Sequence, residues 1–251
     1  MPVLASVPMN VVDRLRAAGC VFAEEEAALL AETATSPDHL EALVAERVGG
    51  LPLEHVVGWA EFCGHRIVVT KGVFVPRHRT ELLVDLATEL KPALVVDLCC
   101  GSGAVGAVLQ QRLPNATVYA ADIDPTAVQC ARQNLTNVLE GDLFDALPAH
   151  LKGRIDVVVA NVPYVPTDDI QFMPPEAREY EARVALDGGT DGLEVLRRVA
   201  TQAKTWLRPG GHLMSETSSR QAPAALDAFT AAGLAAELIT EEDSTAVVGR
   251  S

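Results

Sequence analysis

The stretch Ala93-Leu-Val-Val-Asp-Leu-Cys-Cys-Gly-Ser-Gly103 decides the fold. Its apolar beginning predicts a buried strand that ends at Asp97, and small residues then turn the chain into a helix that runs to about Arg112. Small residues let the backbone pass close to a ligand, and the first N–H groups of a helix can bind one. The stretch therefore predicts a ligand-binding strand, turn and helix.

Strands and helices alternate along the rest of the chain. Further strands are predicted at 117–121, 155–160, 211–216, 234–240 and 245–249. This alternation is typical of an α/β fold with a mostly parallel, doubly wound sheet, whose ligands bind beyond the carboxyl ends of the strands. Only Glu241-Glu242-Asp243 separates the last two strands, and a parallel crossover needs about a dozen residues. These two strands are therefore expected to form an antiparallel hairpin.

The region before this sheet has a different character. Residues 1–54 predict a small helical N-terminal domain, in which Ser36-Pro37 begins a helix and Glu24-Glu25-Glu26 forms a solvated helix start. Residues 55–78 predict a β-hairpin linker. Residues 79–251 then form the ligand-binding α/β domain.

Composition limits the kinds of partner. The chain has 251 residues, is 49% hydrophobic and carries a net charge of −14. Such a balance argues against a general phosphate-backbone binder, and 4% aromatic residues argue against base stacking. Only residues 61–91 are not acidic, with five basic and four acidic side chains. The charge therefore favours a protein partner with some basic surface over a nucleic acid.

The cysteines and the apolar residues indicate a compartment. Five cysteines without a Cys-x-x-Cys pair indicate neither a disulfide framework nor a zinc site, and no other metal site is expected. No signal peptide and no apolar run of about 18 residues occur. A reducing cytoplasm is the expected location.

Acidic residues end the next strands. Asp122 closes the second strand and suits the hydroxyls of a ribose, and Asp142-Leu143 is placed to meet an adenine. The glycines of Gly101-Ser-Gly-Ala-Val-Gly106, followed by Asp122, also fit a dinucleotide fingerprint. Asp97 directly before the turn and the antiparallel end of the sheet oppose that alternative.

The tetrapeptide Asn161-Val-Pro-Tyr164 follows the strand 155–160 and suggests the chemistry. An amide or aromatic amine nitrogen is a poor nucleophile because its lone pair is delocalised. The side-chain oxygen of Asn161 and the carbonyl of Val162 could accept its two N–H groups, while Tyr164 stacks on the planar group. The polar segment Thr167–Arg183 that follows fits either a lid or a surface loop.

These motifs together resemble the HemK/PrmC-type protein-(glutamine N5) methyltransferases, which have the class I S-adenosylmethionine-dependent fold. The resemblance covers nearly the whole chain. The other segments that resemble the family are Gly58-Trp59-Ala60-Glu61-Phe62, Val75-Pro76-Arg77, Thr80-Glu81-Leu82-Leu83, Ala121-Asp122-Ile123, Ala185 to Leu193 and Val247-Val248-Gly249-Arg250. It implies a seven-stranded sheet, a helical domain that recognises the substrate and a hairpin linker.

The resemblance also implies an activity and its residues. A glutamine side-chain amide in the Gly-Gly-Gln loop of a release factor, or of a related protein, would be methylated, with S-adenosyl-L-homocysteine as product. The implied cofactor-binding residues are Asp97, Cys99, Cys100, Gly101, Ser102, Gly103, Asp122, Asp142, Leu143 and Asn161. The implied catalytic residues are Asn161, Val162, Pro163 and Tyr164. The enzyme is expected to be a monomer that binds neither membrane nor, directly, nucleic acid.

Five positions depart from the family text, and one of them is Ala182, which follows Glu181 where the family usually has proline. Val162 replaces the first proline of Asn-Pro-Pro-Tyr, so the carbonyl acceptor loses the fixed φ of proline and is expected to be looser. His78 and Arg79 replace Pro and Glu of Pro-Arg-Pro-Glu-Thr-Glu, which reverses one charge. Cys99 replaces the first glycine of the cofactor turn.

Three alternatives stay open at this point. An adenine-N6 methyltransferase on RNA or DNA would use the same type of tetrapeptide. A nicotinamide-dependent oxidoreductase would use the glycine fingerprint. A non-catalytic cofactor-binding protein would keep the fold, as the changes at Val162 and Arg79 allow.

Overall fold

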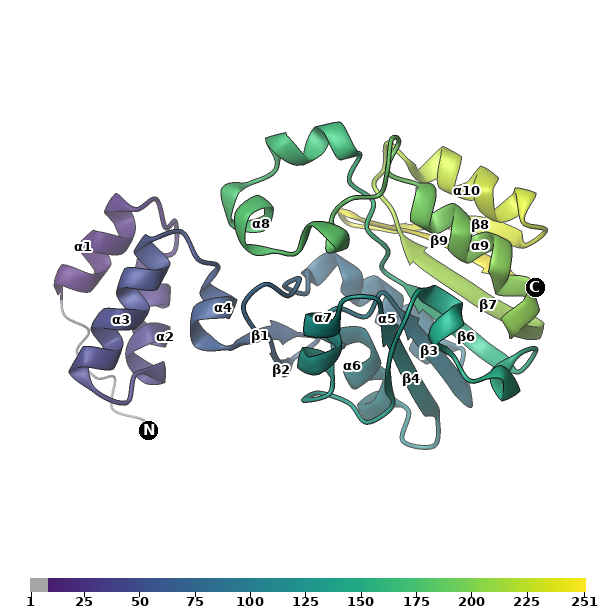
Figure 1. Ribbon diagram of the computed structural model, residues 1–251, viewed down its shortest axis with the longest axis horizontal. Coiled ribbons are helices and arrows are strands. Elements are labelled where there is room, and N and C mark those ends of the chain that lie inside the picture. The colour runs from purple at the N-terminus through teal and green to yellow at the C-terminus, as the bar shows by residue number, and fades with distance from the viewer. Residues whose placement is uncertain (1–8) are drawn as a thin grey trace.

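The computed structural model describes residues 9–251 (Figure 1). A helical unit lies at one end of the molecule, and an α/β part at the other, with a short hairpin between them. The helical unit contains α1 (Met9–Ala17), α2 (Ala23–Thr33), α3 (Pro37–Val48) and α4 (Leu53–Val57). The hairpin contains β1 (Trp59–Phe62) and β2 (His65–Val68), which pair antiparallel.

The helical unit has a hydrophobic core of its own. Leu15, Leu30 and Val44, from three different helices, are fully buried in it. Ser36 begins α3 as its sequence predicts, because its Oγ accepts a hydrogen bond of 3.1 Å from the N–H of His39. Packing between amphipathic helices therefore holds this unit together.

One acid of the unit is not solvated. The prediction of a solvated helix start is wrong for Glu26, which is 8% exposed. Arg47 of α3 donates to it from Nε at 2.6 Å and from Nη2 at 3.1 Å. The same guanidinium reaches Glu176 at 2.5 Å, in the α/β part. Arg47 thus joins the helical unit to a segment 129 residues further along the chain.

Replacing Arg47 with methionine is expected to lower the free energy of unfolding by about 2–3 kcal/mol, since Glu26 would be left buried without a cation. Urea denaturation checks this value. The matched variant Glu176→Gln removes a half-exposed partner and should cost less than about 1 kcal/mol. Equal losses in both variants would contradict this account of Arg47.

The α/β part is built on one seven-stranded sheet of order β5-β4-β3-β6-β7-β9-β8. Its strands are β3 (Leu94–Leu98), β4 (Thr117–Asp122), β5 (Val138–Glu140), β6 (Ile155–Ala160), β7 (Leu207–Glu216), β8 (Ala235–Glu241) and β9 (Ser244–Arg250). The pairs from β5 to β7 are parallel, and β9 is antiparallel to both β7 and β8. The doubly wound sheet and its antiparallel end are therefore confirmed. The predicted strands missed the three-residue β5 and the first four residues of β7, and several other strand ends differ by one residue.

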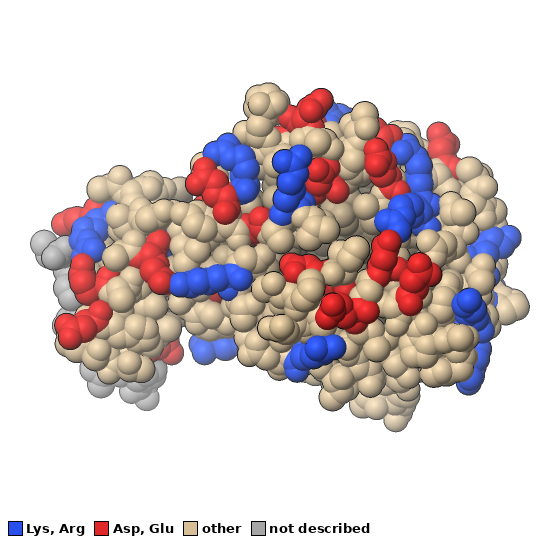
Figure 2. Space-filling view, in the orientation of Figure 1, with Lys and Arg blue, Asp and Glu red and all other residues tan. Residues whose placement is uncertain are grey.

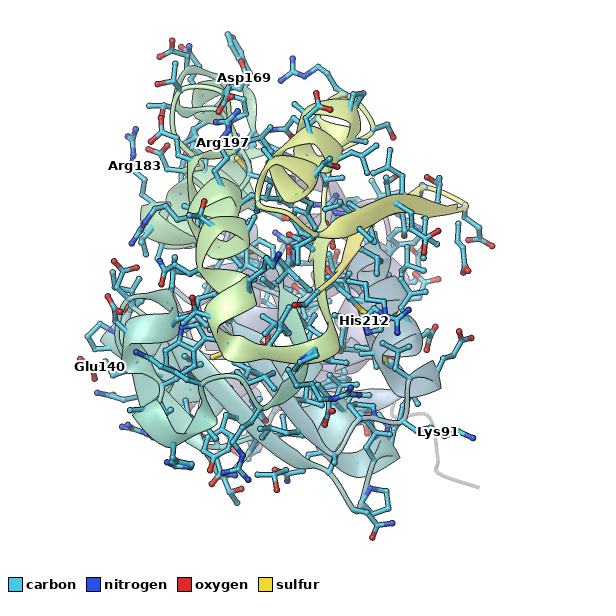
Figure 3. All side chains as sticks on the ribbon, turned by 90° about the vertical axis from the view of Figure 1, so that its right-hand side faces the viewer. Lys91, Glu140, Asp169, Arg183, Arg197 and His212 are labelled. Carbon is cyan, nitrogen blue, oxygen red and sulfur yellow. The ribbon has the colours of Figure 1, made fainter. Side chains whose placement is uncertain are left out.

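Helices cover both faces of the sheet. They are α5 (Glu81–Glu89), α6 (Ala104–Arg112), α7 (Pro125–Ala131), α9 (Glu194–Trp206) and α10 (Ala222–Ala231). Val95 belongs to the core under α5, α6 and α7, whereas its neighbour Val96 belongs to the core under α9 and α10. Figure 3 shows α9 and α10 lying over this second face. Because successive strand residues point to opposite faces, the unbroken apolar runs of the sequence fill both cores.

The segment predicted as a lid or a loop contains short helices. They are η4 (Thr167–Phe172), α8 (Pro175–Tyr180) and η5 (Arg183–Ala185). Besides the Glu176–Arg47 pair, the hydroxyl of Tyr180 donates to the carbonyl of Gly49 at 2.8 Å. The segment therefore contacts the helical unit through α8, as its position in Figure 1 indicates. Within residues 9–251, no helix has the length and apolarity that a membrane span requires.

Candidate functional site

The turn after β3 contains left-handed residues at three positions. The φ angle is 55° at Cys99, 55° at Gly101 and 77° at Gly103. A Cβ atom at Gly103 would lie 2.5 Å from Cδ2 of Leu135, so only glycine lets the turn pack against the chain behind it. Cys99 is not a glycine, and the left-handed backbone conformation is about 1–2 kcal/mol less favourable for a residue with a side chain. Gly103 therefore supports the turn from behind rather than facing the ligand side.

Asp122 fastens this turn to the end of β4. Its Oδ2 accepts from the N–H of Gly101, and its Oδ1 from the N–H of Asp124, each at 2.9 Å. Burial raises the pKa of Asp122, although these hydrogen bonds to the charged form oppose the shift. The predicted ribose-binding carboxylate thus stands beside the turn, with its position fixed by backbone donors.

Asp142 and Leu143 follow β5 at the next strand end. Asp142 is ion-paired with Arg198 of α9 at 2.6 Å. Leu143 is buried and has a φ of 51°, a left-handed conformation that turns the chain at this point. Both residues border the same cavity as Asp122.

Asp97 is the most deeply buried of the three acids, at 1% exposure. Its Oδ2 accepts from the N–H of Gly106 at 2.9 Å. Burial raises the pKa of Asp97 to about 7, with a further contribution from the charge of Asp122 and opposition from the Gly106 hydrogen bond. A cationic ligand group placed beside this carboxylate would favour its charged form.

The pKa of Asp97 predicts a pH-dependent stability. Since the folded pKa lies above the unfolded one, this side chain stabilises the fold below about pH 4 and loses that contribution as the pH rises toward 7. Asp97→Asn should therefore raise the free energy of unfolding of the ligand-free protein by roughly 2–4 kcal/mol at pH 8, and by less than about 1 kcal/mol at pH 4. Thermal or urea unfolding at both pH values checks this, with Asp227→Asn on the exposed face of α10 as control. A variant less stable than the wild type at pH 8 would contradict it.

The tetrapeptide Asn161–Tyr164 lies at the carboxyl end of β6. Nδ2 of Asn161 donates to Oγ1 of Thr80 at 3.2 Å. Val162 is 1% exposed and belongs to the core under α9. Packing of the valine side chain therefore restrains the chain at this position.

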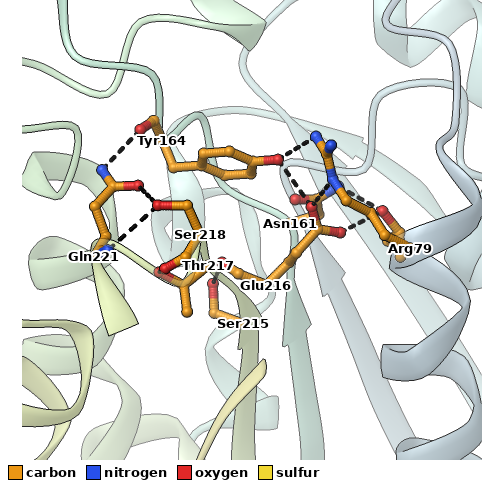
Figure 4. A network of polar contacts seen from close by, with 9 residues as sticks. Arg79, Asn161, Tyr164, Ser215, Glu216, Thr217, Ser218 and Gln221 are labelled. Carbon is orange, nitrogen blue, oxygen red and sulfur yellow. Dashed lines mark hydrogen bonds and ion pairs between the residues drawn. The ribbon is translucent and has the colours of Figure 1, made fainter. Parts of the chain in front are cut away.

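Behind this tetrapeptide, a polar network gathers around Glu216, the last residue of β7 (Figure 4). Glu216 is 3% exposed and accepts from Nε of Arg79 at 2.6 Å and from Oγ1 of Thr80 at 2.5 Å. The hydroxyl of Tyr164 also donates to it, at 2.9 Å, and contacts Nη2 of Arg79. Gln221 donates to the backbone carbonyl of Tyr164 at 2.9 Å. The network thus fixes both ends of the tyrosine.

One cavity, of about 240 Å³, brings the predicted site residues together. Its lining includes Asp97, Cys99, Cys100, Gly101, Ser102, Asp122, Asp142, Leu143, Asn161, Val162, Pro163 and Tyr164. Among the predicted residues, only Gly103 is absent from this lining. In the sheet, β4 and β6 flank β3, so Asp122 and Asn161 stand on opposite sides of the turn. Such a cavity can hold an elongated ligand along the strand ends, with an acceptor group at Asn161.

Sequence reasoning did not assign Thr80 and Glu216 to the site. In the sequence, Thr80 belongs to a segment that resembles the family, while Glu216 ends a predicted strand just as Asp97 and Asp122 do. An acidic residue at the carboxyl end of a third strand was the signal that could have identified Glu216.

One group of side chains near the site contains possible metal ligands. Glu61, His78 and Glu81 each place one ligand atom within 4.8 Å of the others. His78 is 3.0 Å from Glu81, and this contact raises the pKa of His78. His78 and Glu61 are exposed, and the arrangement is that of a surface ion pair.

Most basic side chains of residues 61–91 contact a partner within the molecule, although most of them are exposed. Lys71 pairs with Glu46 at 2.7 Å and Arg77 with Glu181 at 2.7 Å, besides the pair of Arg79. Arg66 lies over the ring of Trp59. On the face shown in Figure 2, acidic and basic side chains are interspersed without an extended basic area.

Comparison with known proteins shows the family to which the chain is related. The family model named Methyltransferase small domain matches residues 65–175. The release factor glutamine methyltransferase of Geobacter sulfurreducens is 39% identical over 223 residues, which are 84% of this chain and 77% of that protein. The 4-amino-L-phenylalanine/4-methylamino-L-phenylalanine methyltransferase of Streptomyces pristinaespiralis is 35% identical, over 76% of this chain and 69% of that protein.

A solved structure has the same fold. It is a Thermus thermophilus 16S rRNA N2 G1207 methyltransferase in complex with AdoMet and guanosine, with a TM-score of 0.53 and 20% identity. The likeness covers 77% of this chain and 49% of that one. The sheet and its helices are therefore those of the class I methyltransferase fold.

Proposed function

Because this chain belongs to the release factor glutamine methyltransferase family, we propose that it transfers the methyl group of S-adenosylmethionine to a glutamine side-chain amide in a peptide-chain release factor. One observation carries the proposal for the site. The acid at the end of β4 and the tetrapeptide after β6 line one cavity, on either side of the turn after β3.

The residues around the turn fit the cofactor. Asp122 presents a carboxylate that suits the hydroxyls of a ribose, and Asp142 and Leu143 stand where an adenine would follow. Asp97 is a buried carboxylate whose charged form a cationic group would favour. When bound, S-adenosylmethionine supplies an activated methyl group, which leaves sulfur as the new nitrogen–carbon bond forms and S-adenosyl-L-homocysteine is released.

The tetrapeptide after β6 fits the acceptor. Oδ1 of Asn161 and the carbonyl of Val162, two residues that line the cavity, would accept the two N–H groups of the glutamine amide. These two hydrogen bonds orient the nitrogen toward the methyl group and help to localise its lone pair, and Pro163 and Tyr164 form the wall beside it. After transfer, one N–H proton is lost to solvent. Catalysis by this chain is then alignment and polarisation.

The remaining parts of the chain have proposed roles as well. We assign residues 1–54 to recognition of the release factor, residues 55–78 to linking and residues 79–251 to methyl transfer. The Arg47–Glu176 ion pair supports the first assignment, because it joins the helical unit to α8, in the segment that follows the tetrapeptide. We also propose that the enzyme acts as a monomer in the cytoplasm, where its proposed substrate belongs to the translation machinery.

Incubation with labelled S-adenosylmethionine and a purified release factor tests the proposal. The expected result is one methyl group on the glutamine of the Gly-Gly-Gln loop, mapped by mass spectrometry. A release factor in which alanine replaces that glutamine is the matched control and should remain unlabelled.

Three further acceptors in the same assay test the alternatives. They are total RNA, duplex DNA and 4-amino-L-phenylalanine, the last chosen because a 35% identical relative is named for it. Label on one of these acceptors and none on the release factor would overturn the proposal.

A further inference from the structure

The carboxylate of Glu216 stands behind the acceptor site without lining the cavity. It is 3% exposed, and three side chains from two other parts of the chain donate to it: Arg79, Thr80 and Tyr164. Burying a carboxylate has a desolvation penalty, which only well-placed donors and an opposite charge can offset. The proposed methyl transfer gives Glu216 no direct contact with either substrate.

The hydrogen-bond chain from Glu216 has a fixed polarity. A carboxylate only accepts, so the single hydroxyl proton of Thr80 is donated to Oε2 of Glu216. The lone pairs of Thr80 are then the acceptors left for its other neighbour, Asn161, at 3.2 Å. An amide donates only through its nitrogen, so Nδ2 of Asn161 faces Thr80 and Oδ1 faces away from it.

We propose, on the basis of the proposed function, that Glu216 and Thr80 are positioning residues that hold the amide of Asn161 with its oxygen toward the glutamine. Rotation of that amide by half a turn would present an N–H group to the N–H of the acceptor. Such an arrangement has two donors and no acceptor, and it would lose the hydrogen bond that aligns the nucleophile. The chain Glu216–Thr80–Asn161 excludes it.

The same carboxylate also holds the tyrosine of the motif. Burial and the charge of Glu216 raise the pKa of Tyr164, so the hydroxyl keeps its proton and donates it to Oε1 of Glu216. Arg79 supplies the compensating positive charge, with its Nε 2.6 Å from that oxygen. Glu216 thereby fixes the first and the last residue of Asn161–Tyr164 at once.

Thr80→Val removes the hydroxyl and keeps the shape of the side chain. We expect kcat for the release factor to fall by about 10- to 100-fold, because a freely rotating Asn161 amide is misaligned in part of the complexes. The KM for the release factor and the Kd for S-adenosyl-L-homocysteine should change less than about threefold, since neither depends on this rotation. Thr80→Ser restores the hydroxyl and should return kcat to within about threefold of the wild type.

Glu216→Gln is a second test with nearly the same shape. A glutamine can donate to Thr80, which reverses the chain, so a similar fall in kcat is expected. Thr88→Val is the matched control, since Thr88 also bonds through its hydroxyl, to the carbonyl of Val84, but lies away from the cavity. Thermal unfolding of each variant separates loss of alignment from loss of fold.

A measurement without substrate tests the orientation itself. In ¹⁵N-labelled protein, the side-chain NH₂ signals of Asn161, identified by their absence in Asn161→Asp, should shift in Thr80→Val and remain near their wild-type positions in Thr80→Ser. Unchanged signals in Thr80→Val, wild-type kcat in that variant, or equal losses in the valine and serine variants would overturn the inference. A wild-type enzyme that does not methylate the release factor would overturn the proposed function instead.

Discussion

Replacing Asn161 with alanine is expected to lower kcat by about 10²–10³-fold, the usual effect of deleting one preorganised polar group at a reaction centre. The acceptor amide would lose the oxygen that accepts one of its N–H groups, and its nitrogen would be free to turn from the methyl donor. The affinity for S-adenosyl-L-homocysteine should fall less, because most of its proposed contacts lie at the turn after β3 and at Asp122. Steady-state kinetics with a release factor and calorimetry with the product measure the two quantities.

The exposed residue Asn115, between α6 and β4, provides the control for this experiment. Asn115→Ala makes the same chemical change at a site remote from the cavity and should leave kcat unchanged. An Asn161→Ala enzyme with wild-type turnover would remove Asn161 from the proposed role, whatever its affinity for the product.

Local patterns in the sequence predicted the fold and the cofactor side of the site. The strand that ends at Asp97, its glycine turn and the acid at Asp122 lie close together in the chain, so their geometry follows from one strand, one turn and the next strand. Parallel strands bring their carboxyl ends to one edge of a sheet, which is why Asn161 could be placed beside them without knowledge of its contacts.

Contacts between residues far apart in the chain could not be predicted from such local patterns. Thr80 and Glu216 are 136 residues apart in the chain and meet only because η1 (His78–Thr80) packs at the end of β7. The burial of Glu26 could not be predicted for the same reason, since it depends on an arginine 21 residues away. A polar side chain at the surface of an isolated helix and one paired across an interface look alike in sequence.

The three-residue β5 shows another limit. Val138–Glu140 is too short for a periodicity of two to be recognised, and its place at the sheet edge comes from pairing with β4. The acid that follows it, Asp142, was nevertheless placed correctly at a strand end, because the composition of Gly141-Asp142-Leu143 indicates a turn.

Replacing Asp122 with alanine is expected to weaken the binding of S-adenosyl-L-homocysteine by about 100-fold. Hydrogen bonds to a charged group contribute roughly 1.5–3 kcal/mol each, and the proposed function has Asp122 form them with the ribose hydroxyls. It also holds the N–H of Gly101 at 2.9 Å, so the variant loses the anchor of the turn as well as the ligand contact. Isothermal titration calorimetry gives the affinity directly.

Asp124, two residues further on, separates these contributions. Its Oδ1 accepts from the N–H of Thr126 at 2.9 Å and caps α7, so Asp124→Ala should cost about 1 kcal/mol of stability. Asp124 also borders the cavity, but its carboxylate caps the helix, so its effect on product affinity should be much smaller than that of Asp122→Ala. If Asp122→Ala also bound the product within threefold of the wild type, the ribose would have to be held elsewhere in the cavity. A 100-fold loss confined to Asp122→Ala is the result that the geometry of the strand end requires.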